Sequence, residues 1–360
     1  MSAIAGVRGV LPDNVYTQDE ITAVLTEVVL GGQAARSERR ALVERLHRSA
    51  SVRTRHLALP LDRYRDLGGF GGANDAFIEV GTDLGERAVA AALGATGLTG
   101  EDVDLLMTTS VTGIAAPSLD ARLVPRLGLR PDVRRVPIFG LGCVAGAAGI
   151  ARLHDYLVGH PDDVAVLLSV ELCSLTFQAD DPSTANLVGS GLFGDGAAAV
   201  VMVGARRAAA MGLEGGAPRV LDTRSRFYPG TERVMGWDIG SGGFRLVLAA
   251  TVAEVVQAHL RDDVEAFLDL HQLKIRDVDT WVAHPGGPKV IDAIVQSLDL
   301  EPAALDVTRR SLEAIGNLSS SSVLHVLETT LAEGLPTPGT PGLLLAMGPG
   351  FCAELVLLEW

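Results

Sequence analysis

Short apolar runs, bounded by glycine or acidic turns, recur along the chain and predict buried strands. Residues 164–170 and 343–347 are such runs, and neither is long enough to cross a bilayer. Because the runs are continuously apolar rather than alternating, the strands they predict are buried on both faces, with helices on both sides of a sheet. Small and apolar residues at helical spacing predict helices over 146–156, 289–298 and 323–331. The pattern predicts a layered α/β protein.

Two parts of this pattern occur twice. Residues 101–110 form an acidic turn and an apolar strand followed by a helical pattern, and residues 276–284 repeat the plan. A Gly-x-Gly turn opens a long apolar strand at 194–203, and a similar turn opens the strand at 348–358. Two copies of one unit predict a duplicated α/β architecture with a pseudo-twofold axis.

Composition and charge narrow the class of protein. The chain has 360 residues, 48% hydrophobic and 21% charged, which is enough apolar material for one large or two medium domains. A net charge of −14 argues against a nucleic-acid partner, because phosphate binding needs basic patches. Three cysteines, an odd number in a long chain, favour a reducing compartment. Residues 1–15 lack a basic start followed by a long apolar stretch, so we predict a cytoplasmic protein without a signal peptide or a membrane partner.

One cysteine lies where an apolar strand meets a small-residue helix. Cys143 stands in the glycine-rich segment 140–149, after residues 136–139, which we predict to be a buried strand end. A thiol at a helix N-terminus lies in the positive end of the helix dipole, which favours the thiolate, and the free amides there can hold an oxyanion. By itself the position also fits an inert buried cysteine.

Two further segments place chemically useful side chains at the ends of elements. His284 ends an apolar strand before a glycine and proline turn, and Asn317 opens a polar small-residue run that leads into a helix. The three residues are 141 and 33 positions apart, so only the fold can bring them together. A thiolate takes an acyl group, while histidine and amide N–H groups donate to a thioester oxygen. Cys143, His284 and Asn317 are therefore the candidate catalytic residues.

Taken together, the motifs resemble those of the type III polyketide synthases of the chalcone synthase superfamily. They lie in order over nearly the whole chain: Ser51–His56, Gly142-Cys143, Leu192–Ala197, His284-Pro-Gly-Gly-Pro288, Gly316–Ser320 and Gly348-Pro349-Gly350. The resemblance implies a thiolase-like fold, a duplicated αβαβα five-layer sandwich. Residues 1–220 would form the half with the nucleophilic cysteine, and residues 221–360 the half with the histidine and asparagine. Residues 235–240 are more similar to bacterial alkylresorcinol and alkylpyrone synthases than to plant enzymes.

The resemblance implies an acyltransferase that needs no metal and no cofactor besides its CoA thioester substrates. Cys143 would carry an acyl starter and then the growing chain. His284 would assist the thiolate and, with Asn317, stabilise the enolate that malonyl-CoA forms on losing CO₂. Repeated condensations would end in cyclisation to a resorcinol-, pyrone- or related aromatic product. The family also implies a homodimer.

Positions that would line the substrate cavity depart from the plant enzymes. Phe193 matches an aromatic position between the CoA tunnel and the cavity, and Cys173 stands where chalcone synthases have threonine, although it also fits a structural cysteine. Trp237 replaces a small residue and Leu246 a phenylalanine, which suits a flexible, alkyl starter better than a planar one. The remaining expected cavity residues are Glu171, Thr176 and Ser319, candidates for positioning a water; Ala116, which marks the position that reaches into a neighbouring subunit; and Gly348, Pro349 and Gly350, which form a wall.

For CoA, the resemblance points to an arginine-rich segment that we predict to be helical over 37–56. Arg45 matches one of the three basic positions of the plant enzymes, and Arg48 is a possible substitute for the other two, which are Leu42 and Ser49 here. Arginine suits phosphate because its guanidinium forks onto oxygen pairs. A solvated charged helix face is the alternative.

Three other functions remain open at this point. A ketoacyl synthase III-like enzyme would perform a single condensation, with an acyl-carrier protein as a possible donor, but such enzymes usually carry His-Gln-Ala-Asn where this chain has His-Pro-Gly-Gly. A non-catalytic partner subunit would have lost its nucleophile, and Cys143 is present. A thiolase-type cleaving enzyme would need a second cysteine, for which Cys352 is the candidate.

Overall fold

The computed structural model describes residues 1–30, 37–213 and 215–360. Among these residues, nine strands form one mixed sheet in the order β11-β12-β13-β8-β1-β7-β6-β4-β5. These strands are β1 Ser2–Val10, β4 Leu105–Thr109, β5 Arg134–Ile138, β6 Val164–Leu172, β7 Asp195–Gly204, β8 Arg219–Phe227, β11 Thr280–Ala283, β12 Pro341–Gly348 and β13 Cys352–Glu359. Two small antiparallel pairs join β2 Asn14–Thr17 to β3 Thr54–Leu57 and β9 Met235–Gly240 to β10 Gly243–Leu248.

The large sheet consists of two similar halves that meet at β1 and β8 through only two residue pairs. In the N-terminal half, β4 runs parallel to β6, and β7 is antiparallel to both β6 and β1. In the C-terminal half, β11 runs parallel to β12, and β13 is antiparallel to both β12 and β8. The second half thus repeats the first without a counterpart of β5. This pairing confirms the predicted duplication, including the matches of β4 with β11 and of β7 with β13.

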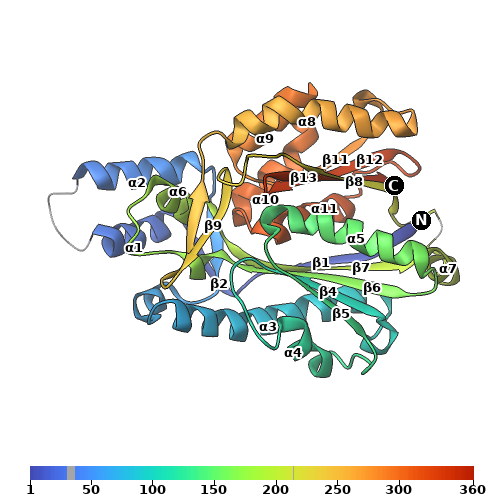
Figure 1. The fold of residues 1–360 in the computed structure, drawn as a ribbon, viewed down its shortest axis with the longest axis horizontal. Helices are drawn as coiled ribbons and strands as arrows, with labels where there is room; N and C mark the ends of the chain where they lie inside the picture. The colour runs from blue at the N-terminus through green and yellow to red at the C-terminus, as the bar shows by residue number, and fades with distance from the viewer. Residues whose placement is uncertain (31–36, 214) are drawn as a thin grey trace.

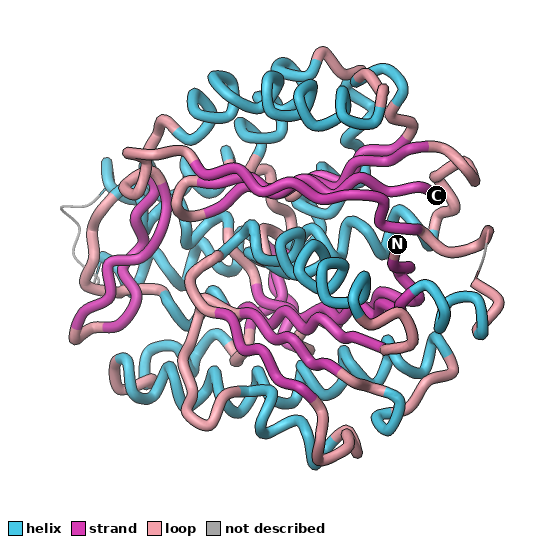
Figure 2. Tube along the Cα trace, turned by 45° about the vertical axis from the view of Figure 1, so that its right-hand side comes forward, coloured by secondary structure: helices cyan, strands magenta, loops and turns pink. Residues whose placement is uncertain are grey.

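Helices separate and cover the two halves of the sheet, giving five layers (Figure 1). The outer layers contain α8 Val252–Leu268 and α9 Pro288–Leu298 on one side, and α3 Phe70–Thr96 and α4 Leu119–Arg126 on the other. Between the two bands of strands in Figure 2 lie α5 Ala145–Gly159 and α11 Ser322–Ala332. Three buried apolar clusters fill the spaces between layers. The remaining helices are α1 Gln18–Leu30, α2 Ser37–Ser49, α6 Thr184–Leu192, α7 Ala205–Ala210 and α10 Asp306–Ile315.

Two local predictions were wrong. The strand end over 136–139 is not buried: β5 is the last strand of the sheet, and Val136 and Phe139 are 37% and 48% exposed. The predicted helix over 37–56 ends at Ser49, because the chain turns at Ser51, whose φ is +56°, and continues as β3. In the described part of the chain, no helix is long and apolar enough to cross a membrane.

Candidate active site

Cys143 lies in a tight turn, residues 142–144, that leads directly into α5. Gly142 has a φ of +54°, and a side chain at this position would come within 2.7 Å of the Pro349 ring. The glycine therefore lets this turn pack against the loop after β12. Cys143 is buried, and its Sγ lies 3.7 Å from the hydroxyl of Ser319.

His284 directly follows β11, and its backbone N–H donates to the carbonyl of Leu345 on the neighbouring strand β12. The side chain is 5% exposed. Neither ring nitrogen has a hydrogen-bond partner among the residues that the structure describes. Unpaired buried polar atoms are uncommon in folded proteins and point to a group that binds there.

Two backbone hydrogen bonds fix the position of Asn317. Its N–H donates to the carbonyl of Leu192, and its own carbonyl accepts from Gly194, so the segment pairs with the end of α6. The side-chain oxygen accepts from the N–H of Ser319 at 2.8 Å. Because that oxygen is occupied, the amide NH₂ is the end left to donate; its contact with the Gly286 carbonyl is long, at 3.5 Å.

Cys143, His284 and Asn317 line one small cavity of about 30 Å³, so the structure brings the three predicted residues together. Apolar side chains form most of the remaining wall, among them Leu248, Val290 and Phe351. A space of this size holds little more than a water molecule. The site is thus a narrow, mostly apolar space around its three polar residues.

Burial shifts the titration of both reactive groups toward their neutral forms. It raises the pKa of the Cys143 thiol to about 12 and lowers the pKa of the His284 imidazole to about 3, because an apolar wall disfavours each charge taken alone. The expectation that the helix dipole favours a free thiolate is therefore not met by the isolated thiol. Opposite charges on two groups that line one cavity would attract each other, which opposes the desolvation that each charge meets alone.

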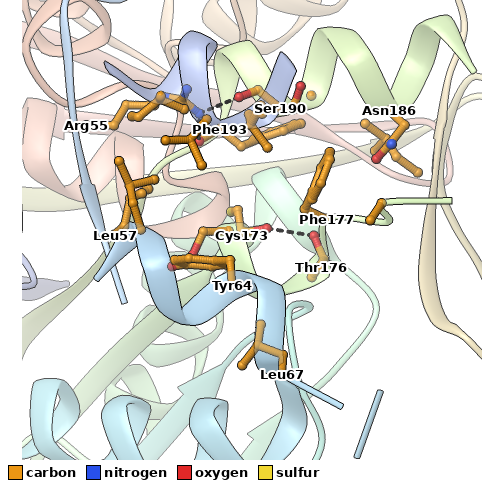
Figure 3. A pocket seen from close by; sticks show the side chains of 18 of the residues that line it. Arg55, Leu57, Tyr64, Leu67, Cys173, Thr176, Phe177, Asn186, Ser190 and Phe193 are labelled. Atoms are coloured by element: carbon orange, nitrogen blue, oxygen red, sulfur yellow. Dashed lines mark hydrogen bonds between the residues drawn. The ribbon is translucent and has the colours of Figure 1, made fainter. Parts of the chain in front are cut away.

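A second cavity, of about 110 Å³, lies on the other side of Phe193, which lines both spaces. Of the predicted cavity residues, Cys173, Thr176, Trp237 and Leu246 line it (Figure 3 labels the first two). Trp237 and Leu246 are paired across the β9–β10 hairpin, which explains why two positions nine residues apart contribute to one wall. Phe193 therefore occupies a dividing position between the two cavities.

Other predicted residues lie outside both cavities. Glu171 is fully buried on β6, where it accepts hydrogen bonds from Ser320 and Thr112 and from the backbone of Val111; burial raises its pKa. Ser319 is also buried, between Asn317 and the Cys143 thiol. Both therefore lie behind the Cys143 thiol rather than in the cavity wall.

The remaining predicted positions fall into three places. Ala116 is exposed on a loop after β4 and lines neither cavity. Gly348–Gly350 packs on the turn that contains Cys143: a side chain at Gly348 would come within 2.8 Å of the Leu141 carbonyl. Arg45 and Arg48 are exposed on α2 and also line neither cavity. Cys352, the thiolase-type candidate, directs its thiol to the Pro349 carbonyl and does not line the cavity of Cys143, His284 and Asn317.

Sequence reasoning missed Arg55 and Tyr64, which line the second cavity. It placed Arg55 on a helix over 37–56, whereas residues 54–57 form β3, which alternates half-buried and buried positions and turns Arg55 inward. The alternation of Thr54-Arg55-His56-Leu57 was the available signal. In the described ranges, no group of three or more His, Cys, Asp or Glu side chains is arranged to hold a metal ion.

Nearly the whole chain matches one family. Residues 2–206 match the N-terminal domain, and residues 220–359 the C-terminal domain, of the chalcone and stilbene synthases. The chain belongs to this family and is an acyltransferase of the type III polyketide synthase class, with CoA thioesters as its substrates and no further cofactor.

Several bacterial proteins are similar to this chain over most of its length. A 1,3,6,8-tetrahydroxynaphthalene synthase of Streptomyces peucetius subsp. caesius is 56% identical over 100% of this chain and 93% of its own length. A putative chalcone synthase of Bacillus subtilis is 36% identical over 87% of each chain. The crystal structure of the 1,3,6,8-tetrahydroxynaphthalene synthase of Streptomyces coelicolor A3(2) superimposes with a TM-score of 0.91 at 30% identity, covering 99% of both chains. The narrower likeness to alkylresorcinol and alkylpyrone synthases stays a prediction.

Proposed function

We propose that the protein condenses malonyl-CoA repeatedly, with loss of CO₂, onto an acyl group held on Cys143, and that the chain cyclises to 1,3,6,8-tetrahydroxynaphthalene. The observation that carries this proposal is the convergence of Cys143, His284 and Asn317 on one buried cavity, next to a second cavity that can receive a growing chain. The 56% identity to a tetrahydroxynaphthalene synthase supports the product.

In the loading step, the Cys143 sulfur attacks the thioester carbonyl of the starter. His284 accepts the thiol proton and returns it to the departing CoA sulfur, so that a new thioester forms on the enzyme as the old one breaks. The raised pKa of Cys143 makes a neighbouring base necessary at neutral pH. The unpaired nitrogens of His284 are free to take that role.

In the extension step, malonyl-CoA loses CO₂ and leaves an enolate. N–H groups of neutral His284 and of Asn317 donate to the enolate oxygen. The Asn317 amide is turned to donate because its oxygen already accepts from Ser319. The enolate carbon attacks the acyl carbonyl, the Cys143 thiolate leaves, and the extended chain returns to Cys143 for the next cycle. The apolar wall keeps water from protonating the enolate.

The second candidate product is a resorcinol or pyrone made from an alkyl acyl-CoA starter. The wall of the second cavity favours it, because many of its residues are aliphatic or aromatic, including Ile21, Leu25, Trp237 and Leu246. The ten ring carbons of tetrahydroxynaphthalene, in contrast, divide into two-carbon units, so that product needs only short starters. The two candidates thus differ in the starter.

We further propose that the protein is a cytoplasmic homodimer. Within each chain, we place the boundary between the N-terminal and C-terminal halves near residue 220. Exposed apolar side chains near one edge, Ile114, Val136 and Phe139, support a subunit contact there, and Ala116 lies in the same stretch. Only two residue pairs join β1 to β8, which supports a boundary between the two halves of the chain there. Three unpaired cysteines fit a reducing compartment. We keep Arg45 and Arg48, which are exposed on α2, as candidates for CoA phosphate contacts.

The proposal is tested by incubating the purified protein with radiolabelled malonyl-CoA, alone and with acyl-CoA starters from acetyl to long-chain. We expect tetrahydroxynaphthalene from malonyl-CoA alone, and no product from Cys143→Ala. Alkyl-primed resorcinols or pyrones in place of tetrahydroxynaphthalene would favour the second candidate. A single β-ketoacyl product from every starter would contradict both.

A further inference from the structure

Arg55 is a buried arginine with an unused hydrogen-bond donor. It is 2% exposed, on β3. Its Nε donates to the side-chain oxygen of Gln18 at 3.1 Å, and its Nη1 donates to the carbonyls of Ser190 and Phe193 at 2.7 and 2.9 Å. Its Nη2 has no hydrogen-bond partner in the described part of the chain. A buried, charged donor without a partner is costly to keep, which points to a ligand that completes it.

The guanidinium also lacks a direct counter-charge. Burial lowers the pKa of Arg55 to about 10, and the nearby carboxylate of Asp195 opposes that shift, so the group stays positive at neutral pH. Asp195 is held elsewhere: it accepts from the backbone N–H groups of Ala58 and Ser174 and from the Ser174 hydroxyl. No ion pair within 4.0 Å joins Arg55 to any carboxylate among the described residues. Arg55 can therefore pair with an incoming anion.

Arg55 lines the second cavity, where such an anion could lie. Figure 3 shows it beside Phe193 and Ser190, across the cavity from Cys173 and Tyr64. Its Nη1 is bonded to the Phe193 carbonyl, and Phe193 also lines the catalytic cavity. Much of the remaining wall is apolar. The cavity thus offers a cationic donor to a ligand that is otherwise largely uncharged, such as the far end of a chain attached to Cys143.

We propose that Arg55 determines starter specificity by binding a carboxylate at the end of the chain farthest from Cys143. The inference rests on the proposed function and adds the chemical class of the starter, an acyl group that carries a free carboxylate. A malonyl group loaded on Cys143 without losing its carboxyl group belongs to this class. Guanidinium and carboxylate match in geometry, since two N–H groups can face two oxygens.

The test compares two starters of similar shape that differ in charge. Succinyl-CoA ends in a carboxylate, and 4-methylpentanoyl-CoA ends in an isopropyl group of similar size; each is offered with malonyl-CoA, and extended products carrying the starter are measured as kcat/KM. We expect the wild-type protein to favour succinyl-CoA at least about tenfold. Arg55→Gln should remove or reverse this preference, and Arg55→Lys should retain part of it. Arg65→Gln, which changes an exposed arginine paired with Glu27, should leave the preference unchanged.

Two features keep the outcome decisive. Arg55 also bonds Gln18 and Phe193, so Arg55→Gln can fail to fold; Leu246→Glu, which adds a competing carboxylate to the same cavity wall, should then abolish the succinyl preference with Arg55 intact. If the wild-type protein extends both starters equally well, the inference about Arg55 is wrong while the proposed condensation stands. If no starter is extended and malonyl-CoA alone yields no product, the proposed function itself fails.

Discussion

α5 and α11 pack against each other, and Gly146 on α5 faces the segment that leads from Asn317 into α11, so this contact sets the position of Cys143 relative to Asn317. A methyl group at Gly146 would come within 2.6 Å of Val323 and still closer to the backbone carbonyl of Ser320. Since ordinary carbon contacts need about 3.5 Å, Gly146→Ala must move the two segments apart by roughly 1 Å. Cys143 lies on one segment, and Asn317 and Ser319 on the other.

Two opposing terms give the expected magnitude for Gly146→Ala. Overpacking a core costs about 1–3 kcal/mol, and alanine in place of glycine in a helix stabilises by about 1 kcal/mol. Because the added methyl group meets backbone rather than only a flexible side chain, we expect Gly146→Ala to lose about 2 kcal/mol in the free energy of unfolding. A displacement of roughly 1 Å in a catalytic site can lower turnover about 100-fold, so kcat should fall much further than stability alone explains.

The matched control is Gly94→Ala, because a side chain at Gly94 in α3 would meet nothing within 4 Å. We expect this variant to gain up to about 1 kcal/mol in stability and to keep wild-type kcat. Denaturant unfolding measures the first quantity, and product formation from saturating malonyl-CoA the second. Wild-type kcat in folded Gly146→Ala would refute the reasoning that this contact positions the catalytic residues.

Three further predictions concern the base, the cavity and the subunit contact. Because burial raises the pKa of the Cys143 thiol, its alkylation by iodoacetamide should depend on His284. In His284→Ala the alkylation rate at pH 7 should fall at least tenfold, and the rate should keep rising beyond pH 10. Superimposable pH profiles for the wild-type protein and the variant would contradict this. Trp237→Ala enlarges the second cavity and should raise kcat/KM for dodecanoyl-CoA relative to hexanoyl-CoA about tenfold; an unchanged ratio would mean that Trp237 does not limit chain length. Ile114→Glu should lower the mass measured by light scattering from dimer to monomer, whereas Val158→Glu, at another exposed apolar position, on α5, should not. A dimeric Ile114→Glu would place the subunit contact elsewhere.

Local sequence patterns were sufficient to predict that Cys143, His284 and Asn317 come together in one cavity. Cys143, His284 and Asn317 each lie at the end of a regular element, where glycine turns mark the position in the sequence. The duplication was also predictable, because β4 and β11 follow similar acidic turns. These features depend on a few neighbouring residues, so a local sequence pattern is enough to predict them.

Features that depend on distant neighbours were not predictable in the same way. The apolar run 136–139 looks like a buried strand, but nothing in it shows that β5 has a neighbour on one side only. The arginines near residue 50 looked like one charged helix face, whereas a turn at Ser51 sends Arg55 inward and leaves Arg45 outside. Glu171 was expected in the cavity wall, but the hydrogen bonds that hold it behind Cys143 come from two segments far apart in the sequence, residues 111–112 and Ser320.

The central claim, that Cys143 carries the growing chain, is tested most directly by mass spectrometry of the protein quenched during turnover with malonyl-CoA. The account predicts adducts on the Cys143 peptide that increase by two-carbon keto units, shorter-lived in the wild-type protein than in Asn317→Ala, where extension is slowed. Adducts on Cys173 or Cys352 instead, or product formation by Cys143→Ala, would contradict it.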